Sequence, residues 1–441
     1  MTHIRRFREA LLDPRKAQEK RLLDIVRLNE STIFGKKFGF SSIKNINDYQ
    51  KQVPAANYED LEPYINKQMN GEYGQLSSEK PILYATTSGT TGNPKFIPIT
   101  PTHLKDYTHA FHIHNWGLIR DHVDTVCLPG AQYLIFNSND QEGVVPDGTP
   151  YGAVSGLLRR RQAPLVQRYI ALPSFISRIK DVEQKYYSIL RLALSKRIVT
   201  VASCNPSTLL LMADQLQENA ADLIKDIFDG TMKENMIPDA EIGTELRRHL
   251  TQDKDAARRF SRAMESSGGI LLPSMVWPDM KIITVWKGGP MPFYLDRLPE
   301  KYGIDNFRDF GYMASEGRGT IPLNDEGSGG VAALTSHFFE YVPEEEMNSD
   351  NKTFLTLDQL ETGKRYYIFF TTAAGLYRYN INDLMEVVGF EQNTPILKFV
   401  QKGAGVSSIT GEKLTEEQVT TALSFATRQL QLNNVGHFVL S

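Results

Sequence analysis

Apolar positions at helical spacing mark the first part of the chain. Leu22, Ile25 and Leu28 recur every three residues within 14–30, so they fall on one face of a predicted amphipathic helix. A second helix is predicted over residues 58–69, just before a glycine that can end it. Both helices are expected to pack one face against a core.

Short apolar runs predict strands farther along the chain. Residues 82–86 and 133–137 have strand-like patterns, and a helix-rich stretch extends from about 173 to 265. Inside that stretch "RIVTVAS" has the pattern of a buried strand. Asn205 can then cap the following helix, with Pro206 at its first position.

The pattern changes from residue 281 onward. Segments rich in β-branched and aromatic residues follow one another, separated by short polar turns: "KIITVWKGG", "FRDFGYMAS", "HFFEYV", "TFLTL" and "RYYIFFTT". Together with the first half, they predict an α/β protein whose residues 1–400 form one large multi-layer domain with mixed β-sheets and flanking helices.

The last part of the chain is expected to be a separate, short unit. The segment "FVQKGAGVSSITGEKL" is rich in glycine, serine and lysine and is typical of a hinge. Thr415 and Gln418 form a capping box for a helix starting near 416. A few dozen residues cannot bury a core of their own, so residues 401–441 are expected to be a hinge and the truncated start of a small C-terminal α+β domain.

Composition excludes several classes of protein. The chain has 441 residues, a formal net charge of −3 and 41% hydrophobic residues. This length fits about two or three domains, or one large α/β domain with an appendage. The near-neutral charge argues against non-specific nucleic-acid binding. Cys127 and Cys204 form no C-x-x-C pattern, so neither a disulfide framework nor a thiolate metal site is expected.

Targeting signals are not apparent in the sequence. The N-terminal segment is charged and has no apolar signal region. No run approaches the roughly 20 apolar residues of a membrane span. We therefore expect a soluble, cytoplasmic protein with neither a nucleic-acid nor a membrane partner. Its oligomeric state does not follow from the sequence.

Candidate chemistry begins with the segment "TTSGTTGNPK" at residues 86–95. Gly89 and Gly92 permit positive φ and a close approach of the backbone to a ligand. The hydroxyls and backbone N–H groups can donate to phosphate oxygens, and Lys95 adds a mobile positive charge. The spacing differs from that of a Walker A loop. A phosphate loop explains so many hydroxyls better than a plain polar turn does.

Two later segments carry further candidate groups. Gly288 and Gly289 directly follow a predicted strand, where a close approach to a flat base and a simple strand exit both fit. In "YMASEG", Tyr312 can stack on a base, Ser315 can contact a phosphate and Glu316 can hold Mg²⁺. A solvated loop glutamate is the alternative for Glu316.

The segment "GLYRYNIND" supplies the last candidates. Arg378 can meet a phosphate in bidentate fashion, and Asp383 can accept hydrogen bonds from two ribose hydroxyls. A cross-strand ion pair is the alternative for these charged residues.

These four segments, in this order, resemble the core motifs of the adenylate-forming superfamily, which includes acyl-CoA synthetases and luciferases. Further segments narrow the resemblance to the auxin-responsive acyl-acid amido synthetases of plant hormone conjugation and their bacterial relatives. They extend from about residue 15 to 420 and include "NESTIFGKKFGF", "VPAANYEDLEPYINKQMNGE", "WPDMKIITVWKGGP", "HFFEYVPEEE" and "AAGLYRYNINDLMEVVGF". The resemblance implies that the large domain has the adenylate-forming fold.

The resemblance also implies ATP and Mg²⁺ and a role for each matching residue. The phosphate loop would be Ser88, Gly89, Thr90, Thr91, Gly92 and Lys95. Gly288, Gly289 and Tyr312 would contact the adenine. Ser315 would face the α-phosphate, Glu316 would hold Mg²⁺, Asp383 would bind the ribose and Lys402 would lie at the hinge. Lys95, Ser315 and Glu316 are the predicted catalytic residues.

Three departures from the family pattern stand out. The third motif usually reads Gly-Asp, whereas this chain has Asn382-Asp383, so the turn is in question. The hinge usually reads Arg-Lys and here is Gln401-Lys402, which puts an interdomain contact in question. The family's catalytic lysine lies late in the small domain, and the sequence is expected to lack it; Lys413 lies too early to be assigned that role.

The reaction implied by the resemblance is ATP-dependent activation of a carboxylic acid as an acyl-adenylate. The acyl group then passes to an amine, expected to be an amino acid, to form an amide. Residues 103–120 and 150–176 are expected to line the acyl pocket. An acyl-CoA ligase is the rival enzyme, and a nucleotide- or acyl-adenylate-binding protein with little turnover is the rival of another class. Neither the acid nor the amine follows from the sequence.

Other charged or polar groups carry weaker signals. His109 and His112 share one face of a predicted helix, but no carboxylate partner is nearby, so a metal site is not predicted. Residues 159–161 (three arginines) and 344–346 (three glutamates) are interpreted as solvated charge runs.

Overall fold

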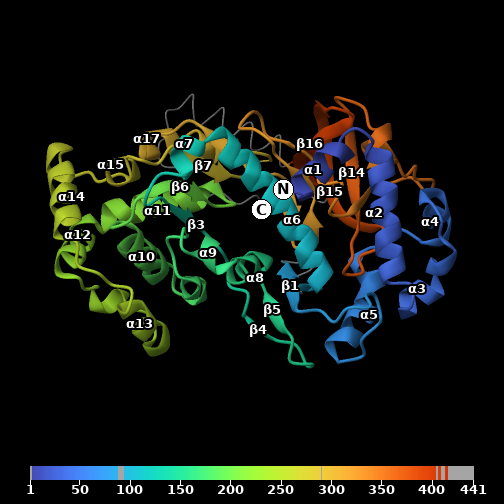
Figure 1. Cartoon of the computed structure of the whole chain (residues 1–441), viewed down its shortest axis with the longest axis horizontal. Coiled ribbons are helices and arrows are strands. Elements are labelled where there is room, and N and C mark those ends of the chain that lie inside the picture. The colour runs from blue at the N-terminus through green and yellow to red at the C-terminus, as the bar shows by residue number, and fades with distance from the viewer. Residues whose placement is uncertain (1, 88–93, 290, 404–405, 409–412, 416–441) are drawn as a thin grey trace.

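Two β-sheets of opposite kind organise the chain (Figure 1). The computed structural model describes residues 2–87, 94–289, 291–403, 406–408 and 413–415. In these ranges one sheet is antiparallel and six-stranded, and another is parallel and four-stranded. The α/β class and the mixture of sheets predicted from the sequence are confirmed.

The antiparallel sheet lies toward the C-terminal end of the chain. Its spatial order is β11-β12-β16-β15-β14-β13. The strands are β11 (Thr320–Ile321), β12 (Gly330–Ala332), β13 (Phe338–Pro343), β14 (Arg365–Thr371), β15 (Tyr379–Glu391) and β16 (Thr394–Lys402).

The parallel sheet has the order β3-β6-β7-β8. Its strands are β3 (Gln132–Ile135), β6 (Ile198–Ala202), β7 (Ile282–Val285) and β8 (Phe307–Asp309). Parallel strands need crossover connections and covered faces. Helices supply both: α10 (Val182–Ala193), α11 (Pro206–Glu218), α12 (Ala220–Asp229), α13 (Ala240–Arg247), α14 (Lys254–Ser266), α15 (Pro273–Val276), α16 (Pro292–Leu295) and α17 (Leu298–Tyr302).

A smaller sheet and two hairpins complete the strands of the described ranges. The smaller sheet has the order β2-β1-β5-β4, with β1 (Leu83–Thr87), β2 (Lys95–Ile99), β4 (Gly143–Val144) and β5 (Pro150–Gly152). The two hairpins are β9 (Met313–Ala314) with β10 (Gly317–Arg318), and β17 (Val406–Ser408) with β18 (Lys413–Thr415).

The N-terminal helices cover the antiparallel sheet (Figure 1). They are α1 (Thr2–Ala10), α2 (Pro14–Leu28), α3 (Ile33–Lys37), α4 (Ile46–Gln52) and α5 (Tyr58–Met69). The buried Gln18 side chain on α2 donates to the carbonyls of Leu334 and His337 and accepts from the amide of Phe339. The long helix α6 (Pro101–Asp121) crosses between the two large sheets, and α7 (Val123–Val126), α8 (Val154–Arg160) and α9 (Pro164–Gln167) follow it.

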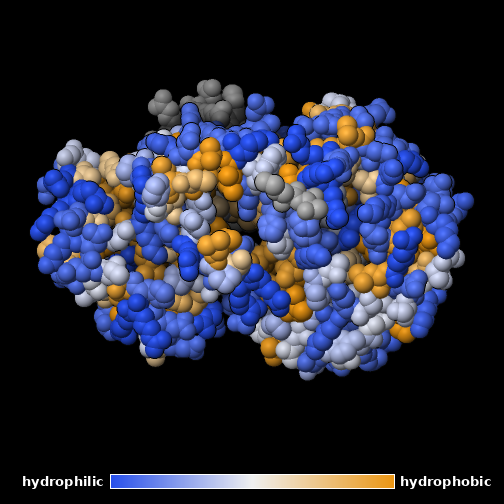
Figure 2. Space-filling model, in the orientation of Figure 1, coloured by the Kyte–Doolittle hydropathy of each residue, from blue (hydrophilic) through white to orange (hydrophobic). Residues whose placement is uncertain are grey.

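The buried apolar side chains form two clusters, which we call the first and the second core. The first core joins the N-terminal helices, the small sheet and the antiparallel sheet. The second core joins the parallel sheet and helices α10 to α17. The space-filling view shows a mostly hydrophilic surface over both parts, with apolar side chains gathered toward the middle of this face (Figure 2).

Most predicted elements occur where the sequence pattern places them. The helix predicted over 58–69 is α5, and the helix predicted within 14–30 is α2. Asn205 caps α11 by accepting a hydrogen bond from the amide of Ser207, as predicted. The helix predicted from 416 lies outside the described residues, and the division into domains at residue 400 stays a prediction. None of the described helices is long and apolar enough to span a membrane.

Candidate functional site

The candidate site lies where the exit of β7 meets β16. A Cβ atom added to Gly288 would lie 3.2 Å from the carbonyl oxygen of Phe399. Gly289 has φ +61°, and a Cβ there would lie 3.3 Å from the Phe399 ring. Only glycine permits this close approach together with a left-handed backbone. The Gly-Gly pair therefore lets the parallel sheet contact the antiparallel sheet directly.

Tyr312, Phe399, Asp383 and Lys402 form one connected group. The Tyr312 ring lies parallel to the Phe399 ring, with 5.7 Å between ring centroids and 5° between planes. Its hydroxyl donates to Asp383 Oδ2 at 2.5 Å, and Lys402 Nζ donates to Asp383 Oδ1 at 2.7 Å. Burial raises the pKa of Asp383, while Lys402 and the Tyr312 hydroxyl oppose that shift. The structure thus brings together three of the predicted nucleotide-binding residues and adds Phe399.

The backbone before Asp383 explains the first departure from the family pattern. Asn382 has φ +60°, which is the left-handed conformation that glycine adopts most readily. Asparagine is one of the few other residues that tolerate it. The amide of Asn382 donates to Asn380 Oδ1, and its carbonyl accepts from the amide of Gly403. Asn382 therefore takes the backbone conformation that a glycine favours.

Ser315 and Glu316 form the two-residue tip of the β9–β10 hairpin. The Tyr107 hydroxyl of α6 donates to the carbonyl of Ala314 at 2.9 Å. On the other strand, the amide of Arg318 donates to His337 Nε2 at 3.3 Å. These contacts from α6 and from the residue before β13 fix the position of the hairpin tip.

Glu316 is buried and responds to the other charges of the site. Burial raises its pKa to about 7, and the negative charge of Asp383 adds to this shift. The positive charges of Lys402 and Lys95 act in the opposite direction and lower the pKa. Among the described residues, no side chain pairs with the Glu316 carboxylate. Glu316 is therefore not the solvated loop residue of the alternative interpretation.

Lys95 begins β2 directly opposite the end of β1. Its Cα pairs with that of Thr87 in the antiparallel ladder. Its Nζ atom lies 5.2 Å from the centroid of the Tyr58 ring and 4.0 Å from Glu59 Oε1. The predicted phosphate-loop residues between the two strands lie outside the described residues: Ser88, Gly89, Thr90, Thr91 and Gly92. Their role stays a prediction.

Arg378 has a structural environment that the sequence prediction did not anticipate. Its buried guanidinium forms an ion pair with Glu340, with 2.9 Å between Nε and Oε2. Its Nη1 atom donates to the carbonyls of Gln50 and Val53, and the guanidinium lies 4.0 Å above the Phe354 ring. These partners favour the ion-pair alternative over the predicted phosphate contact, which stays a prediction. The ion-pair alternative is the one that the structure shows, with Glu340 of β13 as the partner.

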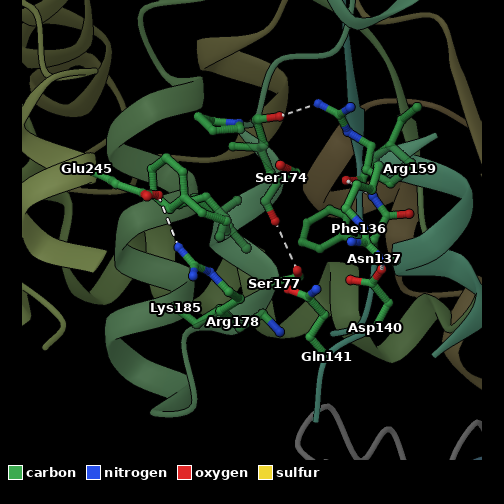
Figure 3. Close-up of a pocket in the computed structure, with 18 residues that line it drawn as sticks. Phe136, Asn137, Asp140, Gln141, Arg159, Ser174, Ser177, Arg178, Lys185 and Glu245 are labelled. Atoms are coloured by element: carbon green, nitrogen blue, oxygen red, sulfur yellow. Dashed lines mark hydrogen bonds and ion pairs between the residues drawn. The ribbon is translucent and has the colours of Figure 1, made fainter. Parts of the chain in front are cut away.

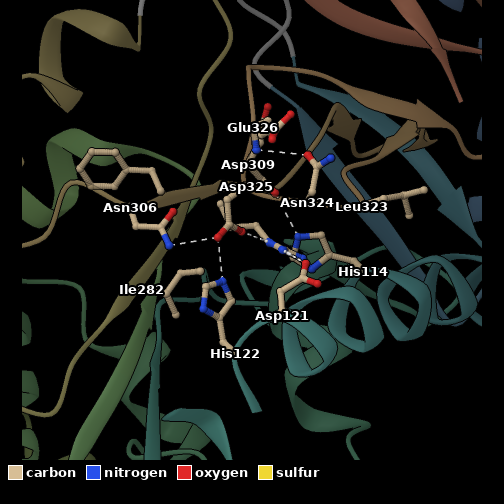
Figure 4. Close-up of polar contacts among 12 residues, drawn as sticks. His114, Asp121, His122, Ile282, Asn306, Asp309, Leu323, Asn324, Asp325 and Glu326 are labelled. Atoms are coloured by element: carbon tan, nitrogen blue, oxygen red, sulfur yellow. Dashed lines mark hydrogen bonds and ion pairs between the residues drawn. The ribbon is translucent and has the colours of Figure 1, made fainter. Parts of the chain in front are cut away.

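A polar network that the sequence did not single out supports the Gly-Gly turn. Asp309 at the end of β8 accepts hydrogen bonds from the amides of Lys287 and Gly311. Burial raises its pKa to about 6, and these amides oppose that shift. His114 of α6 lies within hydrogen-bond distance of the Asp309 carbonyl (Figure 4). An acidic residue at the carboxyl end of a buried parallel strand was the signal that could have identified Asp309.

The outer part of this network ties α6 to the loop after β11 (Figure 4). The buried Arg308 guanidinium forms ion pairs with Asp121 and Asp325. Asp325 also accepts from Asn306 and lies 2.7 Å from His122 Nε2. These contacts hold the carboxyl ends of β7 and β8 against α6, beside the hairpin that carries Glu316.

Comparisons with known proteins identify the family of the chain. The profile described as the GH3 family N-terminal domain matches residues 3–306, and that of the GH3 family central domain matches residues 330–402. An indole-3-acetic acid-amido synthetase, GH3.2 from Arabidopsis thaliana, is 26% identical over 95% of this chain and 80% of its own length. A jasmonoyl–L-amino acid synthetase, GH3.5 from Oryza sativa subsp. japonica, is 25% identical over 97% and 77%.

Solved structures show the same fold. The GH3.15 acyl acid amido synthetase superimposes with a TM-score of 0.85 at 22% identity, covering 98% of this chain and 76% of that chain. A 2-hydroxyisobutyryl-CoA ligase superimposes with a TM-score of 0.53 at 15% identity, covering 93% and 72%. Because the family profiles match most of the chain from residue 3 to residue 402, the protein belongs to the GH3 family.

Proposed function

We propose that this protein is an ATP-dependent acyl-acid amido synthetase. The observation that supports it is the meeting of Gly288, Tyr312, Glu316, Asp383 and Lys402 at one junction, although they come from distant segments. The family relatives named as amido synthetases support the same reaction class. The names of those relatives refer to indole-3-acetic acid and to a jasmonoyl–amino acid product. We therefore propose a small organic acid and an amino acid as the substrates.

In the first step, a carboxylate oxygen of the acid attacks the α-phosphorus of ATP. The bond from that phosphorus to the bridging oxygen breaks, and pyrophosphate leaves with the electron pair. Negative charge grows on the phosphoryl oxygens, so preorganised donors and cations stabilise the transition state. We assign this role to Lys95, Ser315 and the loop from 88 to 92. Asp383 is proposed to hold the ribose, since its carboxylate lies beside Tyr312 and Phe399.

The residues of the hairpin tip fit a Mg²⁺ ion. Glu316 offers a buried carboxylate that no other described side chain pairs with, and Mg²⁺ typically takes one or two carboxylates plus substrate phosphates. Glu316 would hold the ion, which would supply positive charge to the phosphates. The position of Glu316 on a hairpin fixed by Tyr107 and His337 would make this carboxylate preorganised.

In the second step, an amine nitrogen attacks the acyl carbonyl carbon, and the bond from that carbon to the AMP oxygen breaks. AMP leaves with the electron pair, and the nitrogen loses a proton to give the amide. This step depends mainly on orientation, because AMP is a good leaving group. We place the acyl group beside α6, where Tyr107 and Phe111 stack at 5.8 Å and the buried Arg318 guanidinium lies 4.4 Å from the Phe111 ring.

Two rival functions can be separated from this proposal. An acyl-CoA ligase would use the thiol of CoA as the second nucleophile, and a binding protein would retain ATP with little turnover. Mass spectrometry of reactions containing acid, ATP and either CoA or amino acids separates thioester from amide. Calorimetric titration of ATP beside a pyrophosphate-release assay separates an enzyme from a binding protein.

The variant Glu316→Gln tests the proposed metal and catalytic role. We expect it to abolish ATP–pyrophosphate exchange and to remove the Mg²⁺ dependence of ATP affinity measured by calorimetry. The exposed Glu326, ten residues away, provides the matched control Glu326→Gln, which should leave both properties unchanged. Unchanged exchange or unchanged Mg²⁺ dependence in Glu316→Gln would refute the assignment.

A further inference from the structure

A polar cavity lies at the carboxyl end of β3, outside the junction described above. It has a volume of about 260 Å³ and is bounded by the residues after β3, by α8, by the 3₁₀ helix η2 (Ser174–Arg178) and by α10 (Figure 3). Figure 3 shows Arg159 on one side of the cavity and Arg178 and Lys185 on the other, with Ser174 and Ser177 between them. This cavity is smaller than the roughly 300–1,000 Å³ pockets of drug-sized ligands, so any occupant is small.

Two of the four cations that line the cavity already have acidic partners. Arg160 lies 2.7 Å from Asp140, and Arg178 lies 3.1 Å from Glu245. Arg178 also pairs with Glu241. These pairs leave two positive groups, Arg159 and Lys185, for which the described residues supply no acidic partner.

Arg159 is the unusual member of this pair. It is only 8% exposed, so the prediction that the run 159–161 is a solvated charge run is wrong for this residue. Its Nη2 atom donates to the carbonyl of Leu172 at 2.9 Å, whereas its buried Nη1 atom has no hydrogen-bond partner among the described residues. A buried donor without a partner destabilises the folded protein. An anion in the cavity would remove that destabilisation.

Lys185 supports the same conclusion from the opposite wall. It is half-buried on α10, and burial lowers its pKa without an opposing effect from a carboxylate. An anion between Lys185 and Arg159 would favour the charged form of this lysine. The remaining wall is partly apolar and includes Phe136, Leu172 and Ile189. A purely inorganic ion would leave that apolar wall without a partner.

We propose that this cavity binds a small organic carboxylate, with the carboxylate between Arg159 and Lys185 and the apolar part of the molecule against Phe136 and Ile189. None of its described lining residues belongs to α6, so it is separate from the acyl pocket proposed beside the hairpin. It takes up part of the stretch 150–176 that the sequence assigned to the acyl pocket.

The cavity is nevertheless connected to the nucleotide-binding region. Gln141 lines the cavity, and the next residue, Glu142, accepts a hydrogen bond from the Thr86 hydroxyl at 3.3 Å. Thr86 lies in β1, directly before the predicted phosphate loop. A bound carboxylate would therefore occupy a second site that is linked to the end of β1. This inference goes beyond the proposed reaction and does not depend on it.

Binding of sodium benzoate, measured by calorimetry without ATP at constant ionic strength and pH 7.5, tests the proposal. We expect Arg159→Met and Lys185→Met each to weaken benzoate binding by about 10- to 100-fold, as the loss of a charge-assisted hydrogen bond predicts. Arg161→Met is the matched control, because Arg161 is exposed and does not line the cavity. It should bind benzoate like the unmodified protein.

The outcomes separate this site from others. Benzoate bound only elsewhere, including at the proposed acyl pocket, would bind both variants unchanged and would therefore count against this cavity. Benzoate binding unchanged in both variants would overturn the proposal, as would an equal loss in Arg161→Met. Sodium phosphate is the comparison ligand, and phosphate binding as tight as benzoate binding would overturn the carboxylate assignment. Lys185→Met removes no hydrogen bond between described residues, so it remains informative if Arg159→Met fails to fold.

Discussion

The parallel and antiparallel sheets contribute to the candidate site in different ways. The parallel sheet contributes backbone, through Gly288 and Gly289 at the carboxyl end of β7, where open α/β sheets commonly bind ligands. The antiparallel sheet contributes side chains, through Asp383 on β15 and Lys402 on β16. The parallel side therefore depends on the absence of a side chain, whereas the antiparallel side depends on which side chain is present.

The contribution of the antiparallel sheet to the site also depends on how the residues of β15 and β16 are paired. Asp383 and Lys402 are Cα partners, and the register shifts by a bulge one pair farther along, between Leu384 and Met385. A bulge changes the face to which the following side chains point. Asp383 and Lys402 can therefore meet at the site while the rest of β15 keeps its apolar residues in the first core. A charged residue of this sheet can contribute to ligand binding or to the stability of the fold. Measuring ATP affinity and the free energy of unfolding of variants separates the two roles.

The largest expected effect is that of Arg378→Met. The change leaves the Glu340 carboxylate buried without its partner, and breaking a buried ion pair in this way costs about 3–5 kcal/mol. We expect the free energy of unfolding, measured in urea, to fall by this amount. ATP affinity of the folded protein should stay within about twofold, since Arg378 contributes to the fold and not to the site.

A double variant sharpens this prediction. Arg378→Met with Glu340→Gln removes both charges and should recover part of the lost stability, because Gln50 can still hydrogen-bond at position 340. A folded Arg378→Met protein that no longer binds ATP would support a phosphate contact by Arg378. It would also contradict the proposed difference between Arg378, which supports the fold, and Asp383, which belongs to the site.

The second expected effect is pH-dependent and concerns the support of the hairpin. His103 stacks on His337 with 5.1 Å between ring centroids, and burial lowers the pKa of His103 to about 3. In the unfolded chain His103 is protonated near pH 6.5, whereas in the folded protein it stays neutral until the pH is near 3. The free energy of unfolding therefore falls as the pH falls from 6.5 toward 3. For one such histidine the loss reaches about 2 kcal/mol at pH 5.

His103→Phe keeps a stacked ring and removes the titrating group. Its free energy of unfolding should fall less than that of the unmodified protein between pH 7 and pH 5. The exposed His249 provides the control His249→Phe, which should leave the pH dependence unchanged. Equal slopes for His103→Phe and the unmodified protein would show that the first core does not depend on a neutral His103.

The smallest expected effect is that of Gly288→Ala. The added Cβ would lie 3.2 Å from a backbone carbonyl, so the exit of β7 and strand β16 must move apart slightly. We expect ATP affinity to fall about tenfold, or about 1.4 kcal/mol. Gly389→Ala on β15 is the control, because nothing lies within 4 Å of a Cβ at that position. An unchanged ATP affinity in Gly288→Ala would mean that the contact between the sheets does not shape the site.

Local patterns were sufficient for much of the fold and for part of the site. The Gly-Gly turn, the helix over 58–69 and the Asn205 cap follow from short-range spacing, and the structure contains all three. Contacts between distant segments were not predictable in this way. Arg378 finds Glu340 and the carbonyls of Gln50 and Val53 only after folding.

Burial was the second property that sequence patterns did not reveal. Glu316 and Arg159 both lie in segments that look exposed, yet both are buried. Charged residues in a loop or a basic run are usually solvated, so the pattern alone favours the wrong interpretation. Phe399 was missed for the opposite reason, because an aromatic residue in a strand is usually interpreted as part of the core. The Phe399 ring packs against the first core and also lies beside Gly289 and Tyr312.

The left-handed backbone of Asn382 has a consequence for tracing distant relatives. At this position the backbone needs a left-handed dihedral angle, φ +60°, which more than one type of residue can adopt. Glycine reaches this angle freely and asparagine reaches it at small cost, so both letters encode the same turn before the aspartate. A search for Gly-Asp alone would miss chains like this one, whereas a search that accepts either residue would follow the geometry on which Asp383 depends.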